Sequence, residues 1–382
     1  MFPYFYIIIF FGGALSCSSN QSSLNETSSL IATGKIKKFS LDSETKYNAF
    51  YLYPFSDATN HQYLSFLNYG TNQILFYDLD SGRFLFKINM PSDGPDGVVQ
   101  PSGYYIKDFE HIYLTSYSYN GIIKIDTTSH IVHKIPYTKT DNGFKFLPSY
   151  TPSSHPYTAP YFIGNRMFLM PPLVDRFCPA EKTPLSISMD TLSYRFFASE
   201  ITYSQVLSEE ELGTNDTRCS RIFDGNSFIY SFYVDDEILV TSIDHKEFKK
   251  IKAESQHIHS SIDKQKKGLD GPKSNLEVAR YGDLIHDKYR NVYYRFAYHK
   301  VELDHKTNWR GKAVYGRKKF SVIILDQNFK VIGETLFPES IYNSYVSFVN
   351  EEGLYISRDY QIGTGNQSED FLSFELFKLI DL

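Results

Sequence analysis

A single strand–turn–strand pattern recurs along most of the chain and limits the folds that it can adopt. A short alternating strand ends at an Asp, a turn follows, and a second alternating strand returns. The clearest copies are 74–78 with 83–88, and 122–126 with 130–135, and weaker copies begin at 185, 238, 320 and 374. Asp and Gly at the turns supply the local hydrogen bonds and the permissive backbone that tight hairpins need, so each copy is predicted to be a β-hairpin.

Further strands precede the hairpins, for example at 103–109 and 291–300. Three or four strands per unit, repeated about six times, predict an all-β fold, a six-bladed β-propeller. The last unit lacks its outer strand, and the alternating segment 35–41 is expected to supply it, which would close the ring and remove an exposed sheet edge. The insertions between strands are rich in polar and turn-forming residues and are expected to be loops at 138–158, 200–218, 256–279 and 303–318.

The N-terminus carries an apolar run that ends in small residues directly before Cys17. The run is too short to span a hydrocarbon core of about 30 Å as a helix, and it has the length of a signal-peptide core. A cysteine directly after Ala14-Leu15-Ser16 is similar to a bacterial lipobox, in which the thiol receives a diacylglyceryl group. The segment departs from that pattern because it has no Lys or Arg and because its Leu lies one place closer to the cysteine. A buried N-terminal strand is the alternative interpretation.

The segment after Cys17 is polar and Ser-rich, which is typical of a flexible tether. We therefore expect a lipoprotein signal peptide at 1–16, a tether at 17–32 and the propeller at 33–382. The expected location is the cell envelope, with the protein lipid-anchored to the outer membrane on its periplasmic or surface face. A formal net charge of −5 does not favour nucleic acid as a partner, because nucleic-acid binding depends on a basic surface.

Cysteines and histidines indicate little redox or metal chemistry. Cys178 and Cys219 are an even pair in an exported protein, which permits one disulfide. His257 and His259 would lie on one side of an extended backbone, where two imidazoles can share a metal. A zinc site needs at least three protein ligands and no third is identifiable nearby, so neither a metal nor a cofactor is expected.

The segment 291–299 holds the candidate ligand-binding site. Its strand period places Tyr293, Arg295 and His299 on one face and apolar side chains on the other. Neighbouring blades cover both faces of a blade, so the arginine needs a partner there. One interpretation is an ion pair with an Asp or Glu of the next blade. The other is recognition of an anionic ligand, since the planar guanidinium suits carboxylates and phosphates.

A basic run follows, consisting of Lys312, Arg317, Lys318 and Lys319 beside Trp309. It is expected to be a solvated loop, with an interaction patch for an acidic partner or a lipid head group as the alternative.

The sequence as a whole resembles a known family. The apolar leader, the cysteine, the Ser-rich segment and the run from the Asp78 hairpin to the YYRF stretch at 293–296 are similar to a family of bacterial lipoproteins of unknown function. Members have about this length and are assigned to six-bladed propellers. The resemblance covers nearly the whole chain after Cys17. It implies no catalytic residues.

The expected function is binding. The chain has no G-x-S-x-G elbow, no H-E-x-x-H and no Walker loop, so no common catalytic motif points to an enzyme. We expect a membrane-tethered module that recognises an unknown protein, peptide or glycan through its loops. The alternative is a propeller enzyme, a polysaccharide lyase or hydrolase, with its site at the channel mouth. A cluster of His, Tyr, Arg and carboxylate at one end of the channel would favour the enzyme.

The lipid anchor can be tested at Cys17. If the thiol is acylated, the mature protein will partition into the detergent phase, and Cys17→Ala will release it or leave the signal peptide uncleaved. Phase partitioning and the mass of the N-terminal peptide measure both effects. Detergent partitioning and processing that are unchanged in Cys17→Ala would rule out the anchor.

Overall fold

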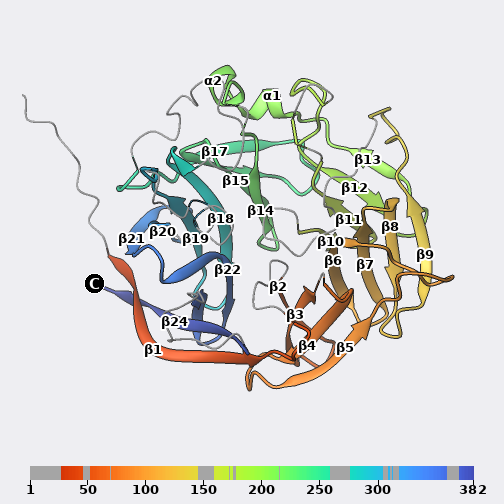
Figure 1. Cartoon of the computed structure of the whole chain (residues 1–382). Helices are drawn as coiled ribbons and strands as arrows, with labels where there is room; N and C mark the ends of the chain where they lie inside the picture. Colours follow the sequence, from red (N-terminus) through yellow and green to blue (C-terminus); the bar gives the residue numbers. More distant parts are fainter. Residues whose placement is uncertain are drawn as a thin grey trace, which may run out of the picture.

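The computed structural model describes residues 27–45, 52–68, 70–144, 159–171, 173–174, 178–214, 216–258, 276–303, 309, 312, 318–358 and 370–382. These residues form six four-stranded antiparallel sheets arranged as a ring (Figure 1). The predicted all-β, six-bladed propeller is therefore confirmed. No helix of this part of the chain is both long enough and apolar enough to cross a membrane.

The blades are numbered in chain order. Blade one consists of β2 (Leu52–Ser56), β3 (Gln62–Asn68), β4 (Gln73–Asp78) and β5 (Phe84–Asn89). Blade two consists of β6 (Pro101–Asp108), β7 (His111–Ser116), β8 (Tyr119–Ile125) and β9 (Ile131–Pro136). Blade three consists of β10 (Tyr161–Ile163), β11 (Arg166–Leu169), β12 (Ile187–Asp190) and β13 (Phe196–Ala198).

The other three blades follow after two short helices, α1 (Tyr203–Val206) and α2 (Glu209–Leu212). Blade four consists of β14 (Cys219–Phe223), β15 (Phe228–Phe232), β16 (Glu237–Thr241) and β17 (Phe248–Lys252). Blade five consists of β18 (Arg280–Asp287), β19 (Val292–Tyr298), β20 (Phe320–Leu325) and β21 (Val331–Phe337). Blade six consists of β22 (Tyr342–Asn350), β23 (Gly353–Arg358), β24 (Phe371–Asp381) and β1 (Ser28–Ser40).

The N-terminal strand completes the last blade and so closes the ring. β1 pairs antiparallel with β24, from Ser28 opposite Asp381 to Ser40 opposite Phe371. The predicted closure by the segment 35–41 is confirmed. β1 nevertheless begins at Ser28, so the predicted tether of 17–32 was wrong for its last residues, whose backbone is paired in the sheet. Residues 1–26, Cys17 included, lie outside the described residues.

β1 also contacts β21, the outer strand of blade five. The Leu30 backbone N–H donates a hydrogen bond to Thr335 Oγ1 at 2.9 Å. At Gly333 the two backbones approach so closely that a Cβ atom would lie 1.8 Å from the carbonyl oxygen of Ser28. The closing strand therefore depends on a residue without a side chain at this position of β21.

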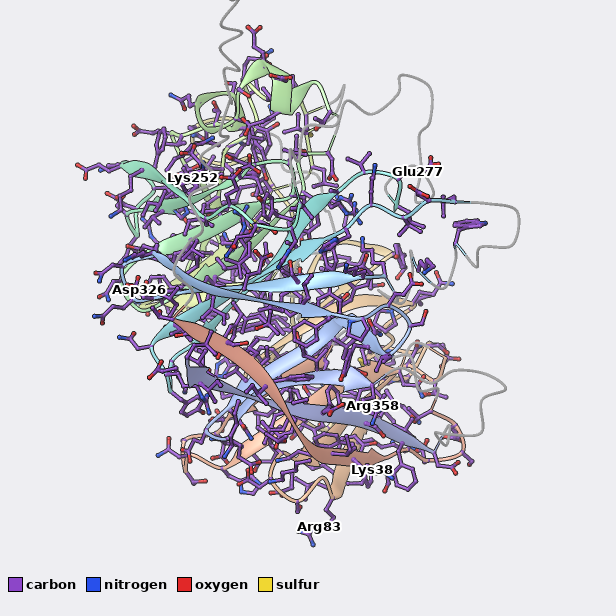
Figure 2. All side chains as sticks on the ribbon, turned by 90° about the vertical axis from the view of Figure 1, so that its left-hand side faces the viewer. Lys38, Arg83, Lys252, Glu277, Asp326 and Arg358 are labelled. Carbon is purple, nitrogen blue, oxygen red and sulfur yellow. The ribbon has the colours of Figure 1, made fainter. Side chains whose placement is uncertain are left out.

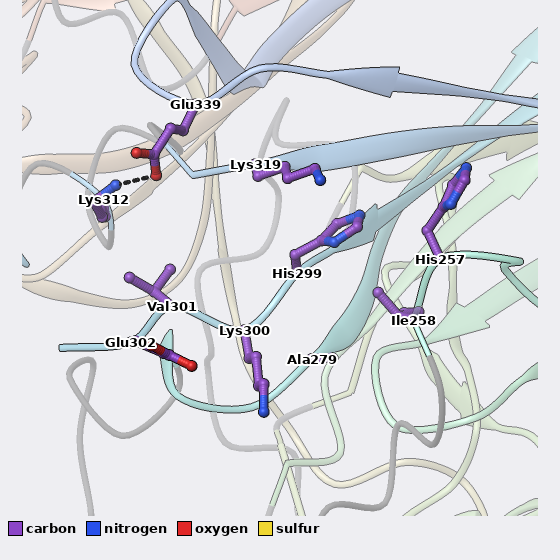
Figure 3. A pocket seen from close by; sticks show the side chains of 10 residues that line it. All are labelled: His257, Ile258, Ala279, His299, Lys300, Val301, Glu302, Lys312, Lys319 and Glu339. Carbon is purple, nitrogen blue, oxygen red and sulfur yellow. Dashed lines mark hydrogen bonds and ion pairs between the residues drawn. The ribbon is translucent and has the colours of Figure 1, made fainter.

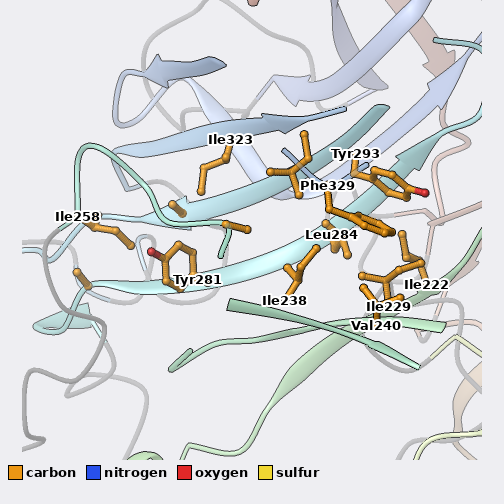
Figure 4. Close-up of a cluster of buried hydrophobic side chains, with 14 residues drawn as sticks. Ile222, Ile229, Ile238, Val240, Ile258, Tyr281, Leu284, Tyr293, Ile323 and Phe329 are labelled. Carbon is orange, nitrogen blue, oxygen red and sulfur yellow. The ribbon is translucent and has the colours of Figure 1, made fainter. Parts of the chain in front are cut away.

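The core consists of apolar clusters between neighbouring blades. Figure 4 shows one of them, in which side chains of blade four, among them Ile222, Ile229 and Ile238, pack against Tyr281 and Leu284 of β18. Tyr and Phe contribute to most of these clusters, which agrees with their suitability for pleated, half-buried surfaces.

Two fully buried arginines connect blades three, four and five. Arg295 of β19 uses all three guanidinium nitrogens on blade four: Nε donates to Ser231 Oγ at 3.0 Å, and the other two donate to backbone carbonyls, among them those of Asp236 and Ala253 at 2.9 Å. Arg221 of β14 donates in the same way to carbonyls of blade three, among them that of Phe168 at 3.0 Å. Each arginine supplies side-chain donors to buried carbonyls of the neighbouring blade, and some of these carbonyls, such as that of Asp236, also accept a backbone hydrogen bond.

The insertions leave the ring from one face. Successive strands of a blade alternate in direction, so the connections between blades and those between the second and third strands lie at the same face. All four insertions belong to these two kinds of connection. We call this side, at which the inner strands begin, the insertion face. Figure 2 shows Glu277 and Arg358 on this side of the molecule and Asp326 on the opposite side.

Closure of the ring can be tested at Gly333. Gly333→Ala places a methyl group against the Ser28 carbonyl and will force β1 away from β21, at a cost of about 1–3 kcal/mol in the free energy of unfolding. Gly70→Ala is the control, because its Cβ would meet only a side-chain oxygen at 3.5 Å. Urea unfolding measures both. Equal stability of the two variants would contradict the close approach.

Arg295 provides a second test of how the blades are held together. Arg295→Met removes all the side-chain donors that link β19 to the buried carbonyls of blade four and will lower the free energy of unfolding by at least about 3 kcal/mol. Arg295→Lys will restore only part of it, because an ammonium lacks the planar fork. The exposed Arg83→Met is the control and will change stability by less than about 0.5 kcal/mol. A loss in Arg295→Met as small as in the control would show that the arginine does not hold the blades.

Candidate functional site

The three residues of the predicted site point toward blade four but end in different surroundings. The Tyr293 hydroxyl donates to Asp224 Oδ2 at 2.9 Å, inside the contact between the blades. Arg295 is fully buried, and its hydrogen bonds go to Ser231 and backbone carbonyls of blade four. Only His299, just beyond the end of β19, reaches a pocket. The predicted face was right, but the structure does not bring the three together around a ligand.

The ion-pair interpretation of Arg295 was also wrong. No carboxylate of the described residues lies within ion-pair distance of it, because the turn between β15 and β16 presents a group of carbonyls at this place. The Tyr281 ring covers the guanidinium, with its centroid 3.7 Å from Cζ. These contacts give Arg295 a structural role and leave no donor for a ligand.

A pocket of about 710 Å³ opens on the insertion face beside His299, and we call it the histidine pocket. It lies between the end of β17 and the strand ends of blade five (Figure 3). Its lining consists of His257, Ile258, Ala279, His299, Lys300, Val301, Glu302, Lys312, Lys319 and Glu339. The rings of His257 and His299 lie side by side, with centroids 6.3 Å apart.

The lining of the histidine pocket is cationic. Glu339 is paired with Lys312, which leaves Lys300 and Lys319 against one further carboxylate. Burial, together with electrostatic interaction with the neighbouring Lys319 and His257, lowers the pKa of His299 to about 4, so this imidazole is neutral at physiological pH. Its Nε2 is buried and has no hydrogen-bond partner among the described residues. The pocket therefore offers the exposed ammonium groups of Lys300 and Lys319 to a ligand.

The metal site considered from the sequence has no support in the described part of the chain. His257 faces His299 in the pocket, and His259 lies outside the described residues. Among the side chains that the structure does place, no three His, Cys, Asp or Glu residues are arranged to hold a metal ion.

The disulfide that the sequence permits is not formed in the structure. Cys178 and Cys219 are both buried, and no disulfide joins them in the structure. Cys219 begins β14, where burial raises the pKa of its thiol to about 12. A thiol in this state is unreactive, which indicates a packing role.

A second group of cations lies on the side of blade five that faces away from the histidine pocket. We call Arg218, Arg280 and Lys318 the basic cluster; they stand before β14, at the start of β18 and before β20. Arg218 Nε and Nη2 donate to the two carboxylate oxygens of Asp216 at 2.6 and 2.7 Å. Arg280 Nη1 lies 3.5 Å from the same carboxylate, and both guanidinium groups lie over the ring of Tyr233.

Lys318 is the most enclosed member of the basic cluster. Its side chain is buried, with Nζ 4.1 Å from the ring centroid of Tyr298, and Nζ has no hydrogen-bond partner among the described residues. Burial and the neighbouring Arg280 and Arg218 hold the pKa of Lys318 well below its usual range. The expectation of a solvated loop was wrong here, because Lys318, two residues before β20, is buried with its ammonium over the rings of Tyr298 and Tyr345.

Sequence reasoning did not find the basic cluster, since its members are separated by long stretches of chain. The signal that could have found Lys318 is its place two residues before an apolar strand, in phase with the buried Phe320. Its neighbour Lys319 takes the opposite side and lines the histidine pocket.

Comparisons with known proteins agree with the fold. A crystal structure of a DUF4221 member from Bacteroides vulgatus superposes with a TM-score of 0.78 at 24% identity, covering 94% of this chain and 100% of that one. A protein from Bacteroides fragilis that is inferred to be exported gives a TM-score of 0.53 at 9% identity, covering 92% and 97%. No curated protein matches the chain. The model of the family described as "Domain of unknown function (DUF4221)" matches residues 28–336. This match covers most of the chain, so the chain belongs to the DUF4221 family.

Proposed function

We propose that this protein is a membrane-tethered binding module of the bacterial cell envelope, which recognises a protein, peptide or glycan at its insertion face. The observation that supports this function best is the histidine pocket, which has the size and concave form of a ligand site and a cationic lining. An acidic group of the ligand, a carboxylate or a phosphate, would be held there.

The side chains of the pocket suit such a group. The exposed ammonium groups of Lys300 and Lys319 attract an anion, and the neutral ring of His299 forms part of the wall of the same pocket. Ile258, Ala279 and Val301 supply the apolar part of the lining that ligand sites usually have.

The position of the N-terminus supports tethering through an acylated Cys17. β1 runs antiparallel to β24, so it begins at the face opposite the insertion face, where Ser28 pairs with Asp381. The residues between Cys17 and Ser28 could span at most about 35 Å when fully extended. An anchor at this end would hold the propeller close to a membrane with the insertion face directed away from it.

An enzyme is the second candidate, and one observation favours it. Arg, Tyr and carboxylate side chains gather where the inner strands begin, as a polysaccharide lyase or hydrolase at the channel mouth would need. The tyrosines weaken this candidate, because burial holds the pKa of Tyr298 well above its usual range and a phenolate base is therefore not available. Release of unsaturated or reducing ends from a polyuronate would establish the enzyme.

The binding proposal can be tested with acidic probes. An oligogalacturonate represents acidic glycans and an oligoglutamate represents acidic peptides, and a neutral oligosaccharide and a neutral peptide serve as matched probes. We expect at least one acidic probe to bind and its neutral counterpart not to bind, as measured by calorimetry. Lys319→Ala and His299→Ala will each weaken that binding by about tenfold or more. Lys252→Ala, an exposed lysine on β17 outside the pocket, is the control.

Two outcomes would contradict the proposed binding function of the histidine pocket. If neither acidic probe binds, or if the two pocket variants bind as tightly as the control, the pocket is not the ligand site. The pKa of His299 adds a further check. Because the ring is neutral from about pH 6 to pH 8, His299→Gln will leave the pH dependence of binding over this range unchanged.

A further inference from the structure

The basic cluster holds more positive than negative charge in a buried place. Arg218 and Arg280 share the single carboxylate of Asp216, and Lys318 lies beside them without an ion pair to any described carboxylate. Asp283 is the other acidic group at this place. It accepts a hydrogen bond from the Tyr233 hydroxyl at 3.1 Å, and burial raises its pKa to about 7, so near neutral pH it supplies only part of a negative charge.

The geometry leaves donors unused. Lys318 Nζ has no hydrogen-bond partner among the described residues, and neither has Nε of Arg280, which is itself only 8% exposed. The two residues are close across the blade, because Arg280 pairs with Tyr298 in the sheet and the Lys318 ammonium lies over the ring of Tyr298. Buried polar groups nearly always have a partner, and a buried cation without one is strongly unfavourable.

We propose that the basic cluster binds a small anion, a carboxylate or phosphate group, between Lys318, Arg280 and Arg218. The anion would supply the missing negative charge and accept hydrogen bonds from Lys318 Nζ and Arg280 Nε. Arg218, which is partly exposed, provides access from the insertion face. This site is separate from the histidine pocket, because Lys318 and Lys319 are consecutive residues that point to opposite sides of blade five.

The competing explanation for the unpaired Lys318 is that its amine is uncharged and binds no anion. An uncharged amine over the rings of Tyr298 and Tyr345 would need no counter-ion. The two explanations differ in how the protein responds to anions: a site stabilises the fold in a saturable way as the anion binds, whereas an uncharged lysine gives no such response.

The test uses the mature chain with inorganic phosphate and with acetate. Melting temperature is measured against the concentration of each anion, with chloride replacing it at constant ionic strength. We expect a saturable rise with at least one of the two anions, and phosphate alone, acetate alone or both will identify the group that the site accepts. Lys318→Met will remove the rise or weaken the apparent affinity by about tenfold or more. Lys318→Arg, which keeps the charge, will retain part of it.

Lys252→Met is the control, because it removes an exposed lysine outside both sites and keeps the full response. Lys319→Met removes the adjacent lysine on the pocket side and tests the histidine pocket in the same assay. Lys318→Met is expected to fold, since methionine fits a space lined by tyrosine rings. An anion response that survives in Lys318→Met, or wild-type protein that gives no saturable response to either anion, would overturn the site. A response lost only in Lys319→Met would assign the anion to the histidine pocket instead and equally overturn it, so failure here is distinguishable from failure of the proposed function.

Discussion

The pairing of β1 with β24 is the contact on which the rest of the structure depends. It joins residues 28 and 381, nearly the two ends of the described chain, and it completes the only blade that is not made of consecutive strands. Each blade buries its faces against its two neighbours, so an open ring would leave blade six without an outer strand and with an exposed sheet edge. The close approach at Gly333 shows that β1 also fixes blade six against blade five.

Blade five carries both candidate sites because its strand ends separate alternate residues. Ala279, His299 and Lys319 line one side, and their neighbours Arg280, Tyr298 and Lys318 lie on the other. The position of these strand ends depends in turn on Arg295, which attaches β19 to the carbonyls of blade four. The fully buried Arg295 thus attaches the strand that leads to His299 firmly to blade four.

Local patterns predicted the fold well and the site only in part. The alternating hairpin at 74–88 corresponds to β4 and β5, and 35–41 lies in β1, because the strand period is written in consecutive residues. Ser-rich composition misled at Ser28, where pairing with β24 overrides it. The strand period also put Arg295 and His299 on the correct face. The strand period could not show that Arg295 donates its hydrogen bonds to carbonyls of blade four. Nor could it show that Arg218, Arg280 and Lys318 lie close together, because these contacts arise between distant segments.

Closure by the N-terminal strand also has a consequence for how an exported chain would mature. Among the described strands, β1 is synthesised first and pairs with β24, which is synthesised last, so the ring can be completed only after β24 has been made. Contacts of such long sequence separation form slowly, and until then the edge of β24 is open to pairing with other chains. If acylation retains the leading end of the chain at the bilayer, β1 waits there while the later blades emerge. The anchor would then act during folding as well as afterwards, by holding the last partner of the ring within reach.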